Sequence, residues 1–192
     1  MKRNIYISFI HDEAKNFKFK MVENHKGRKY KFSNELFDLT STTFEQDKDA
    51  VELLAKNISR TDVTVVLITK SILECNWIPL EVKLSLDLTE HLPNHTKPKG
   101  IIGVVIPEKG NDYSYIMKKG LKGLWYADKE KLPEIISANM HNEIIVQNKY
   151  NKNFDSYISV YRWDNFVSDF DNCINIAYDK ANKHFEDYEI TY

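Results

Sequence analysis

Four short apolar runs separated by helical patterns constrain the fold more than any other feature of this chain. They are Asn4–Ile10, Glu35–Thr40, Asp62–Thr69 and Gly100–Pro107. The third and fourth runs are almost uninterrupted valine, isoleucine and leucine, which is typical of strands buried on both faces of a parallel sheet. Parallel neighbours need a crossover between them, and the intervening helical patterns supply it. The sequence therefore predicts a repeated strand–helix unit.

The segments between the runs have helical spacing. A helix around 13–25 carries Phe17 and Met21 one turn apart, a second follows Asp47 as its N-cap, and a third begins at Asn76. Right-handed crossovers then give an α/β fold, a flavodoxin-like open parallel sheet of about five strands with helices on both faces.

The rest of the chain is expected to complete this sheet. Glu143–Val146 is predicted as the fifth strand, Trp163–His184 as the closing helix, and Asn111–Gly123 as a loop or short helix. A length of 192 residues suits one domain. The expected boundaries are a single domain over 1–192, with a core over 3–110 and an elaborated C-terminal part over 111–192.

Composition excludes several classes of protein. Lys and Arg number 27 against 28 Asp and Glu, a formal net charge of −1, whereas a nucleic-acid binder normally has a basic face. Cys75 and Cys173 lie far apart without metal-ligand spacing, which favours a reduced environment. The N-terminal residues lack a signal-peptide pattern, and no apolar segment is long enough to span a bilayer. We therefore expect a cytoplasmic protein with no membrane or nucleic-acid partner.

Ligands of open parallel sheets bind outside the carboxyl ends of the strands. This rule selects polar and aromatic residues after the first and second runs, namely Ser8, Phe9, His11, Asp38, Thr40 and Ser41. Such residues also favour turns for local reasons, and His11 is as suited to capping a helix as to contacting a ligand. A metal site is not expected, because Pro93 separates His91 and His95.

The third helix carries a carboxylate on an apolar face. Trp77, Leu80, Leu84 and Leu88 form one stripe at helical spacing. Glu81 falls about 40° from Trp77, inside the stripe. A carboxylate placed there loses hydration unless a polar group meets it. Two interpretations are open: a structural Glu paired with Lys or Arg, or an active-site carboxylate in a cleft. Trp77 is equally suited to core packing and to ligand contact.

Common functions of doubly wound folds are excluded by absent motifs. The first run is not followed by Gly-x-Gly-x-x-Gly, and the chain has no Gly-x-x-x-x-Gly-Lys-Ser/Thr, which argues against a dinucleotide dehydrogenase and a P-loop nucleotidase. A phosphoacceptor receiver domain needs an Asp at the end of the third strand, where this chain has Ile68-Thr69-Lys70.

Several segments together resemble TIR domains. Ile5–Phe9 followed by His11-Asp12 resembles their first box, and Trp77-x-x-x-Glu81 resembles the catalytic element of NAD-consuming members. Gly100–Pro107 is similar to their fourth strand, and Tyr157–Trp163 with the following helix is similar to the end of the bacterial branch that includes the TIR proteins of Thoeris anti-phage defence. The chain differs from receptor and adaptor TIRs because Asp38–Gln46 lacks Arg-Asp-x-x-Pro-Gly.

The resemblance implies an enzyme that cleaves the nicotinamide–ribose bond of NAD, as a glycohydrolase or ADP-ribosyl cyclase, with NAD as substrate and no cofactor. Its implied product is a nucleotide second messenger, either a cyclic ADP-ribose isomer or an ADP-ribose conjugate. Implied partners are a phage-derived activator, further TIR chains and a nucleotide-sensing effector. Glu81 is the implied catalytic residue, and substrate contacts are expected from Trp77 and the candidates after the strands.

Two other functions are compatible with the sequence. The first is a non-catalytic TIR-like scaffold or nucleotide-binding module that acts by protein–protein assembly, since a fold does not fix a function. The second is a transferase that modifies free nucleosides on the same sheet architecture and leaves NAD intact.

Overall fold

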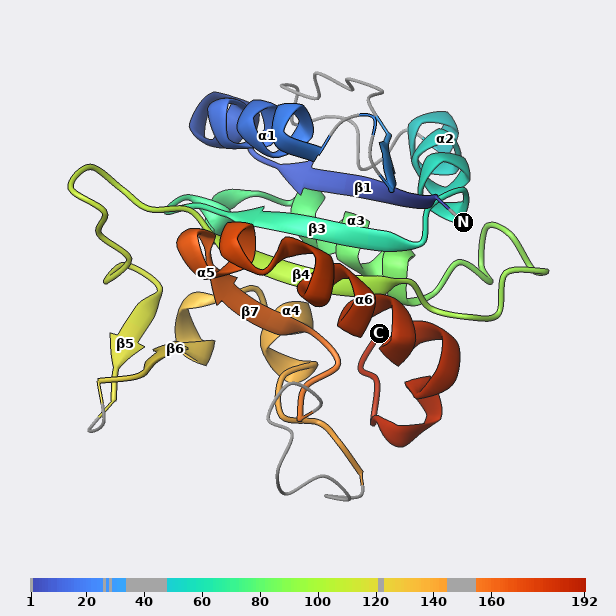
Figure 1. Ribbon diagram of the computed structural model, residues 1–192. Coiled ribbons are helices and arrows are strands. Elements are labelled where there is room, and N and C mark those ends of the chain that lie inside the picture. The colour runs from blue at the N-terminus through green and yellow to red at the C-terminus, as the bar shows by residue number, and fades with distance from the viewer. Residues whose placement is uncertain (1, 26, 28, 34–47, 121–122, 145–154) are drawn as a thin grey trace.

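A computed structural model describes residues 2–25, 27, 29–33, 48–120, 123–144 and 155–192 (Figure 1). Its main sheet has five strands in the order β2-β1-β3-β4-β7, and every neighbouring pair is parallel. The strands are β1 (Arg3–Phe9), β2 (Tyr30–Phe32), β3 (Val63–Ile68), β4 (Gly100–Val105) and β7 (Ser159–Arg162). The predicted flavodoxin-like α/β class is confirmed.

Helices cover both faces of the sheet. One face is covered by α1 (His11–His25), α5 (Trp163–Ser168) and α6 (Phe170–Lys183), and the other by α2 (Lys48–Ser59), α3 (Trp77–Leu86) and α4 (Glu134–Ala138). In Figure 1, α5 and α6 lie in front of the sheet and α3 lies behind it. The described residues also contain three single-turn 3-10 helices: Ile72–Glu74, Lys129–Lys131 and Phe185–Asp187.

The alternation of side chains along β1 separates an apolar face from a polar one. Ile5 and Ile7 join the core beneath α1 and α6, whereas Tyr6 and Ser8 point to the face covered by α2 and α3. The central strands β3 and β4 are buried along their whole length, as their uninterrupted apolar sequences predict. The fold therefore places two hydroxyl groups opposite α3.

The two edge strands of the sheet differ from the predicted second and fifth strands. The second strand is Tyr30–Phe32, which pairs with the first half of β1, and the predicted Glu35–Thr40 lies outside the described residues. The fifth strand is Ser159–Arg162, whereas Glu143 forms only an isolated bridge to Tyr188. Both true strands lie at the edges of the sheet and are short, with half-exposed or alternating residues, so they carry a weak hydrophobic signal.

Other sequence expectations also require correction. Residues 111–123, expected as a loop or short helix, contain β5 (Met117–Lys119), which pairs with β6 (Trp125–Ala127) in an antiparallel hairpin that extends from the body in Figure 1. The closing helix is divided into α5 and α6, with Asp169 between them. Asn76 precedes α3 with helical backbone angles and makes no side-chain capping bond.

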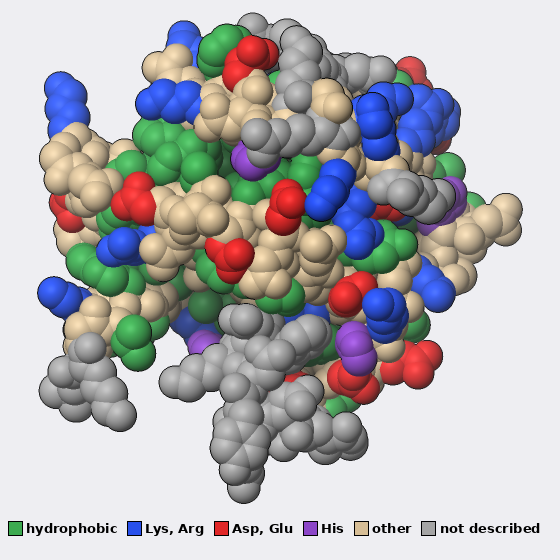
Figure 2. Space-filling model, viewed as in Figure 1, with side chains coloured by type: hydrophobic (Ala, Val, Ile, Leu, Met, Phe, Trp, Pro, Cys, Tyr) green, Lys and Arg blue, Asp and Glu red, His purple; other side chains and the backbone are tan. Residues whose placement is uncertain are grey.

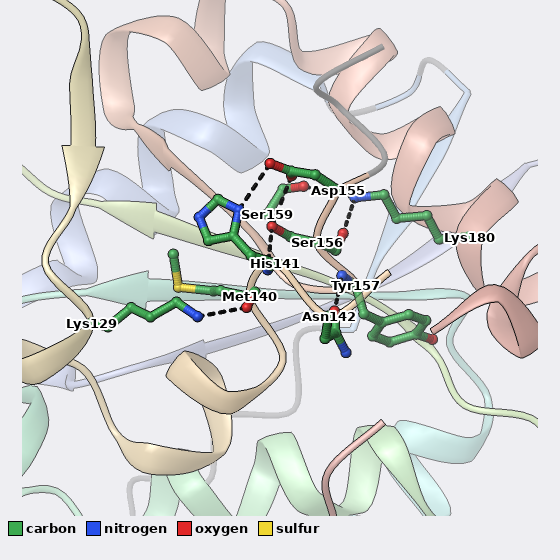
Figure 3. Close-up of polar contacts among 9 residues, drawn as sticks. All are labelled: Lys129, Met140, His141, Asn142, Asp155, Ser156, Tyr157, Ser159 and Lys180. Carbon is green, nitrogen blue, oxygen red and sulfur yellow. Dashed lines mark hydrogen bonds and ion pairs between the residues drawn. The ribbon is translucent and has the colours of Figure 1, made fainter. Parts of the chain in front are cut away.

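A polar network joins the start of β7 to α6 and to the segment after α4 (Figure 3). The buried Lys180 of α6 donates to the Ser156 carbonyl at 2.5 Å and to Ser159 Oγ at 2.7 Å. The Ser156 hydroxyl accepts from the His141 backbone N–H at 2.9 Å and donates to Asp155. These bonds satisfy backbone groups on an edge of the fold where strand pairing ends.

The surface agrees with the balanced composition. Figure 2 shows acidic and basic side chains interspersed over the face in view, without a large area of one sign. Among the described residues, no helix is both long enough and apolar enough to cross a membrane.

Candidate functional site

The candidate site is formed where α3 crosses β1. Glu81 lies one turn into α3 and is only 8% exposed. The Tyr6 hydroxyl donates to Glu81 Oε1 at 2.5 Å, and the Ser8 hydroxyl donates to Oε2. Residues two apart on a strand point the same way, so β1 presents both hydroxyls to one carboxylate. We call Tyr6 and Ser8 the hydroxyl clamp of Glu81.

A second pair of hydroxyls fixes α3 against the sheet. The Ser85 hydroxyl, one turn after Glu81, donates to the Glu81 carbonyl at 2.8 Å. Its oxygen also lies 2.8 Å from Thr64 Oγ1 of β3. Tyr6 and Thr64 are register partners on β1 and β3. The contacts therefore form a continuous polar seam between α3 and two adjacent strands, within an otherwise apolar layer.

Burial controls the ionisation of this site. Burial raises the pKa of Glu81 from 4.5 to about 7, against the hydrogen bonds from Ser8 and Tyr6, which lower it. The pKa of Tyr6 is raised by burial and then by the charge of Glu81 and their hydrogen bond. Near neutral pH the Glu81 carboxyl is thus divided between its two protonation states. A carboxyl with such a pKa is typical of functional sites, although structural networks produce the same shift.

The structural interpretation left open by the sequence, an ion pair with Lys or Arg, does not describe the contacts of Glu81. Within the described part of the chain, the salt bridges involve other carboxylates, and both oxygens of Glu81 accept from hydroxyl groups. Hydroxyl donors leave the negative charge unneutralised. The site therefore retains a carboxylate that is able to stabilise a nearby positive charge.

The other sequence candidates fall into three groups. Trp77 is half-buried in the first turn of α3 and packs in a cluster with Tyr6 and α2, near the clamp. Phe9 points to the opposite face of β1, where its ring packs against the core beneath α1 and lies 6.0 Å from that of His11. His11 begins α1. The remaining three, Asp38, Thr40 and Ser41, lie outside the described residues.

Sequence reasoning named Ser8 but missed Tyr6, its partner in the clamp. The signal was present, because Ile5, Tyr6, Ile7 and Ser8 alternate as the residues of a strand do. A tyrosine within an apolar run is typical of a core residue, and only the position of Glu81 shows that its hydroxyl has an acceptor. As for metals, the described residues contain no group of three or more His, Cys, Asp or Glu side chains placed to hold an ion.

These observations define a class: a flavodoxin-like α/β domain whose candidate site is a buried carboxylate on the helix after the third sheet strand in the chain. The family model for the TIR-like domain of Thoeris protein ThsB matches residues 6–111, more than half of the 192 residues. The chain belongs to this family, which confirms the resemblance. The match includes Tyr6, Ser8, Trp77 and Glu81. A comparison with curated protein sequences finds no match.

Proposed function

We propose that this TIR-like protein cleaves the bond between nicotinamide and ribose in NAD and makes a nucleotide second messenger for anti-phage defence. The observation that carries the proposal is the Glu81 carboxyl, which is buried, held at both oxygens by neutral donors and free of an ion pair within the described residues. Family membership supports a TIR-domain defence protein, and the enzymatic step is our inference.

The proposed step needs one carboxylate and no general acid. The C1′–N bond of NAD breaks, its electron pair returns to the pyridinium nitrogen, and nicotinamide leaves neutral. This differs from ordinary glycosidases, in which a second carboxyl group protonates the leaving group. The ribosyl fragment becomes an oxocarbenium-like cation, which ionised Glu81 stabilises most strongly where water is excluded. An oxygen or nitrogen nucleophile then forms the new bond at C1′ and loses its proton.

The hydroxyl clamp holds Glu81 in one rotamer and keeps part of it ionised. Without the bonds from Ser8 and Tyr6, burial alone would raise the pKa of Glu81 further. Trp77 supports the first turn of α3 and covers the Tyr6 side of the site. We further propose contacts to NAD from Asp38, Thr40 and Ser41, whereas Phe9 packs on the opposite face of β1 and His11 begins α1.

Capture of the cation within the same molecule gives a cyclic ADP-ribose isomer, and capture by an added nucleophile gives an ADP-ribose conjugate. The proposed partners are a phage-derived activator, other TIR chains and an effector that senses the product. The proposal includes a cytoplasmic location, where NAD is plentiful.

One observation favours a second candidate, a non-catalytic scaffold or nucleotide-binding module. Both Glu81 oxygens already have partners and the side chain is 8% exposed, as expected for a carboxyl that only joins α3 to β1. On this interpretation, the raised pKa is a consequence of burial without a catalytic use.

Nicotinamide release distinguishes the two candidates. Purified protein is incubated with NAD and lysate from phage-infected cells, and nicotinamide and nucleotide products are quantified by mass spectrometry. If the protein is the proposed enzyme, nicotinamide is released and Glu81→Gln lowers this release at least about 100-fold. Glu90→Gln, which replaces an exposed carboxyl beyond α3, leaves the release unchanged. Release that survives Glu81→Gln contradicts the assignment of the carboxylate. The absence of release with every activating lysate favours the scaffold.

A further inference from the structure

A hollow opens at the carboxyl ends of β3 and β4, on the α1 side of the sheet. Its volume is about 520 Å³, within the range of small-molecule sites. It is lined by Thr69, Lys70 and Ser71 after β3, by Ile106, Pro107, Glu108 and Lys109 after β4, by Glu13 and Phe17 of α1, and by Tyr115. Glu81 is not among these residues, so the hollow is separate from the candidate site. It lies at the sheet edge where ligands of open α/β folds bind.

The apolar wall of the hollow is held by contacts of its own. The Tyr115 hydroxyl lies 2.6 Å from the Ile106 carbonyl and 2.9 Å from the Ile68 carbonyl, so it links the ends of β4 and β3. Because this hydroxyl is engaged, Tyr115 contributes mainly its ring. The Phe17 ring packs edge-to-face against Trp163 with centroids 5.0 Å apart. The hollow therefore has a preformed aromatic side, which suits a planar ring.

Two carboxylates, Glu13 and Glu108, and two lysines, Lys70 and Lys109, line the hollow. Although burial raises the pKa of Glu13, the side chain and backbone N–H of Ser71 lower it below its usual value, so this carboxylate interacts with the loop after β3. Glu108 lies 3.6 Å from Lys70 in an exposed pair, which contributes little and is easily exchanged. Lys70 and Lys109, from two different loops, both line this hollow.

We propose that this hollow binds a phosphate-bearing aromatic ligand of mononucleotide size. Lys70 and Lys109 hold the phosphate, because two ammonium groups form charge-assisted bonds to its oxygens. The ring lies on the wall formed by Phe17, Ile106 and Tyr115. The site requires no chemistry at Glu81 and does not depend on the proposed function.

The test is calorimetric titration of the whole chain with AMP. The Lys70→Ala/Lys109→Ala variant is expected to weaken AMP binding at least tenfold, and raising the salt concentration weakens it in the wild type. The matched control is Lys2→Ala/Lys97→Ala, two exposed lysines outside the hollow, with a change below twofold. Adenosine, which lacks the phosphate, is expected to bind at least tenfold more weakly than AMP.

Three results overturn the proposal: no AMP binding up to about 5 mM, equal affinity in the double variant and wild type, or equal affinity for adenosine and AMP. Loss of AMP binding in Glu81→Gln with retention in the double variant also overturns it, because the nucleotide then occupies the Glu81 site. A check without mutation is amine acylation of the wild type. AMP is expected to reduce the labelling of Lys70 and Lys109 but not that of Lys97. Labelling of Lys70 and Lys109 that AMP does not reduce contradicts the site.

Discussion

Glu81 and Lys180 are two buried ionisable side chains on opposite faces of one sheet. Glu81 of α3 is 8% exposed and Lys180 of α6 is 1% exposed. Burial shifts both towards their neutral forms, raising the pKa of Glu81 to about 7 and lowering that of Lys180 to about 8. They differ in what they contact. Glu81 accepts from side-chain hydroxyls near the carboxyl end of β1, whereas Lys180 donates to the Ser156 carbonyl and to Ser159 at the start of β7.

The difference shows that an unusual pKa does not by itself identify a functional group. Lys180 holds the chain that enters an edge strand (Figure 3), at the amino end of β7. Glu81 lies at the edge where ligands of open sheets bind. Position in the topology, together with the pKa, separates the candidate catalytic group from the structural one.

The largest expected effect is on NAD cleavage, which we expect to depend on Glu81 and not on Lys180. Glu81→Gln removes the negative charge but keeps the volume and hydrogen-bonding capacity at the clamp, so we expect NAD cleavage to fall at least about 100-fold. Lys180→Ala is expected to change the rate per folded molecule less than about twofold, because its contacts lie at β7. The measurement is nicotinamide release normalised to the folded fraction. A comparable loss in Lys180→Ala would remove the distinction.

The next effect is the pH dependence of stability. Because the folded pKa of Glu81 is raised from 4.5 to about 7, its contribution is fully favourable below pH 4.5 and is lost as the pH rises through 7, with a total of about 3 kcal/mol. The contribution of Lys180 to the free energy of unfolding depends on pH in the opposite direction. Because its pKa is lowered from 10.5 to about 8, this contribution is present above pH 10.5 and is lost as the pH falls through 8.

Urea unfolding of the wild type and Glu81→Gln between pH 5 and 9 measures this effect. The variant is expected to lack the decline between pH 5 and 8 and to be more stable than the wild type at pH 8. Parallel curves for the two proteins would show that Glu81 ionises normally in the folded state, and the proposed tuning by burial would be wrong.

A smaller loss of stability is expected from Lys180→Ala. The truncation leaves a cavity in α6 and removes the donor to the Ser156 carbonyl and Ser159 Oγ, while it also relieves the desolvation of a buried ammonium. We expect the lost packing and hydrogen bonds to outweigh this relief, with a net destabilisation of about 2 kcal/mol at pH 7. Lys183→Ala, an exposed lysine on the same helix, is the matched control in the same urea experiment. Equal midpoints for the two variants would contradict the structural role of Lys180.

Sequence periodicity was sufficient for the centre of the fold and insufficient at its edges. The strands β3 and β4 are buried on both faces, so their sequences are nearly all apolar and their positions were predicted closely. At the edges, β2 has three residues and β7 is half-exposed along its length, and neither produces a period that stands out from a loop. The β5–β6 hairpin is exposed and was missed for the same reason.

The candidate site was predictable in part for a related reason. Helical spacing alone placed Glu81 on a buried face, because the geometry of a helix fixes which residues share a side. Its partners lie 73 and 75 positions away in the chain, and no local pattern pairs Glu81 with Ser8 and Tyr6. Phe9 was assigned to the site by its position after a strand, yet alternation turns its ring to the opposite face.

The smallest expected effect comes from the clamp itself. Tyr6→Phe and Ser8→Ala each remove one hydrogen bond that lowers the pKa of Glu81, so its pKa rises further and less of the carboxylate is ionised at neutral pH. If ionised Glu81 is the active form, the rising limb of NAD cleavage against pH moves to higher pH in both variants. The rate at pH 7 then falls about two- to tenfold and recovers towards the wild-type value near pH 9, since a shift of one pH unit corresponds to tenfold in ionisation.

Thr64→Val, which alters the same seam without touching the carboxylate, is the matched control and should leave the pH profile in place. A loss of rate that is equal at every pH would mean that Tyr6 and Ser8 act on the substrate or on the orientation of Glu81, and not on its ionisation.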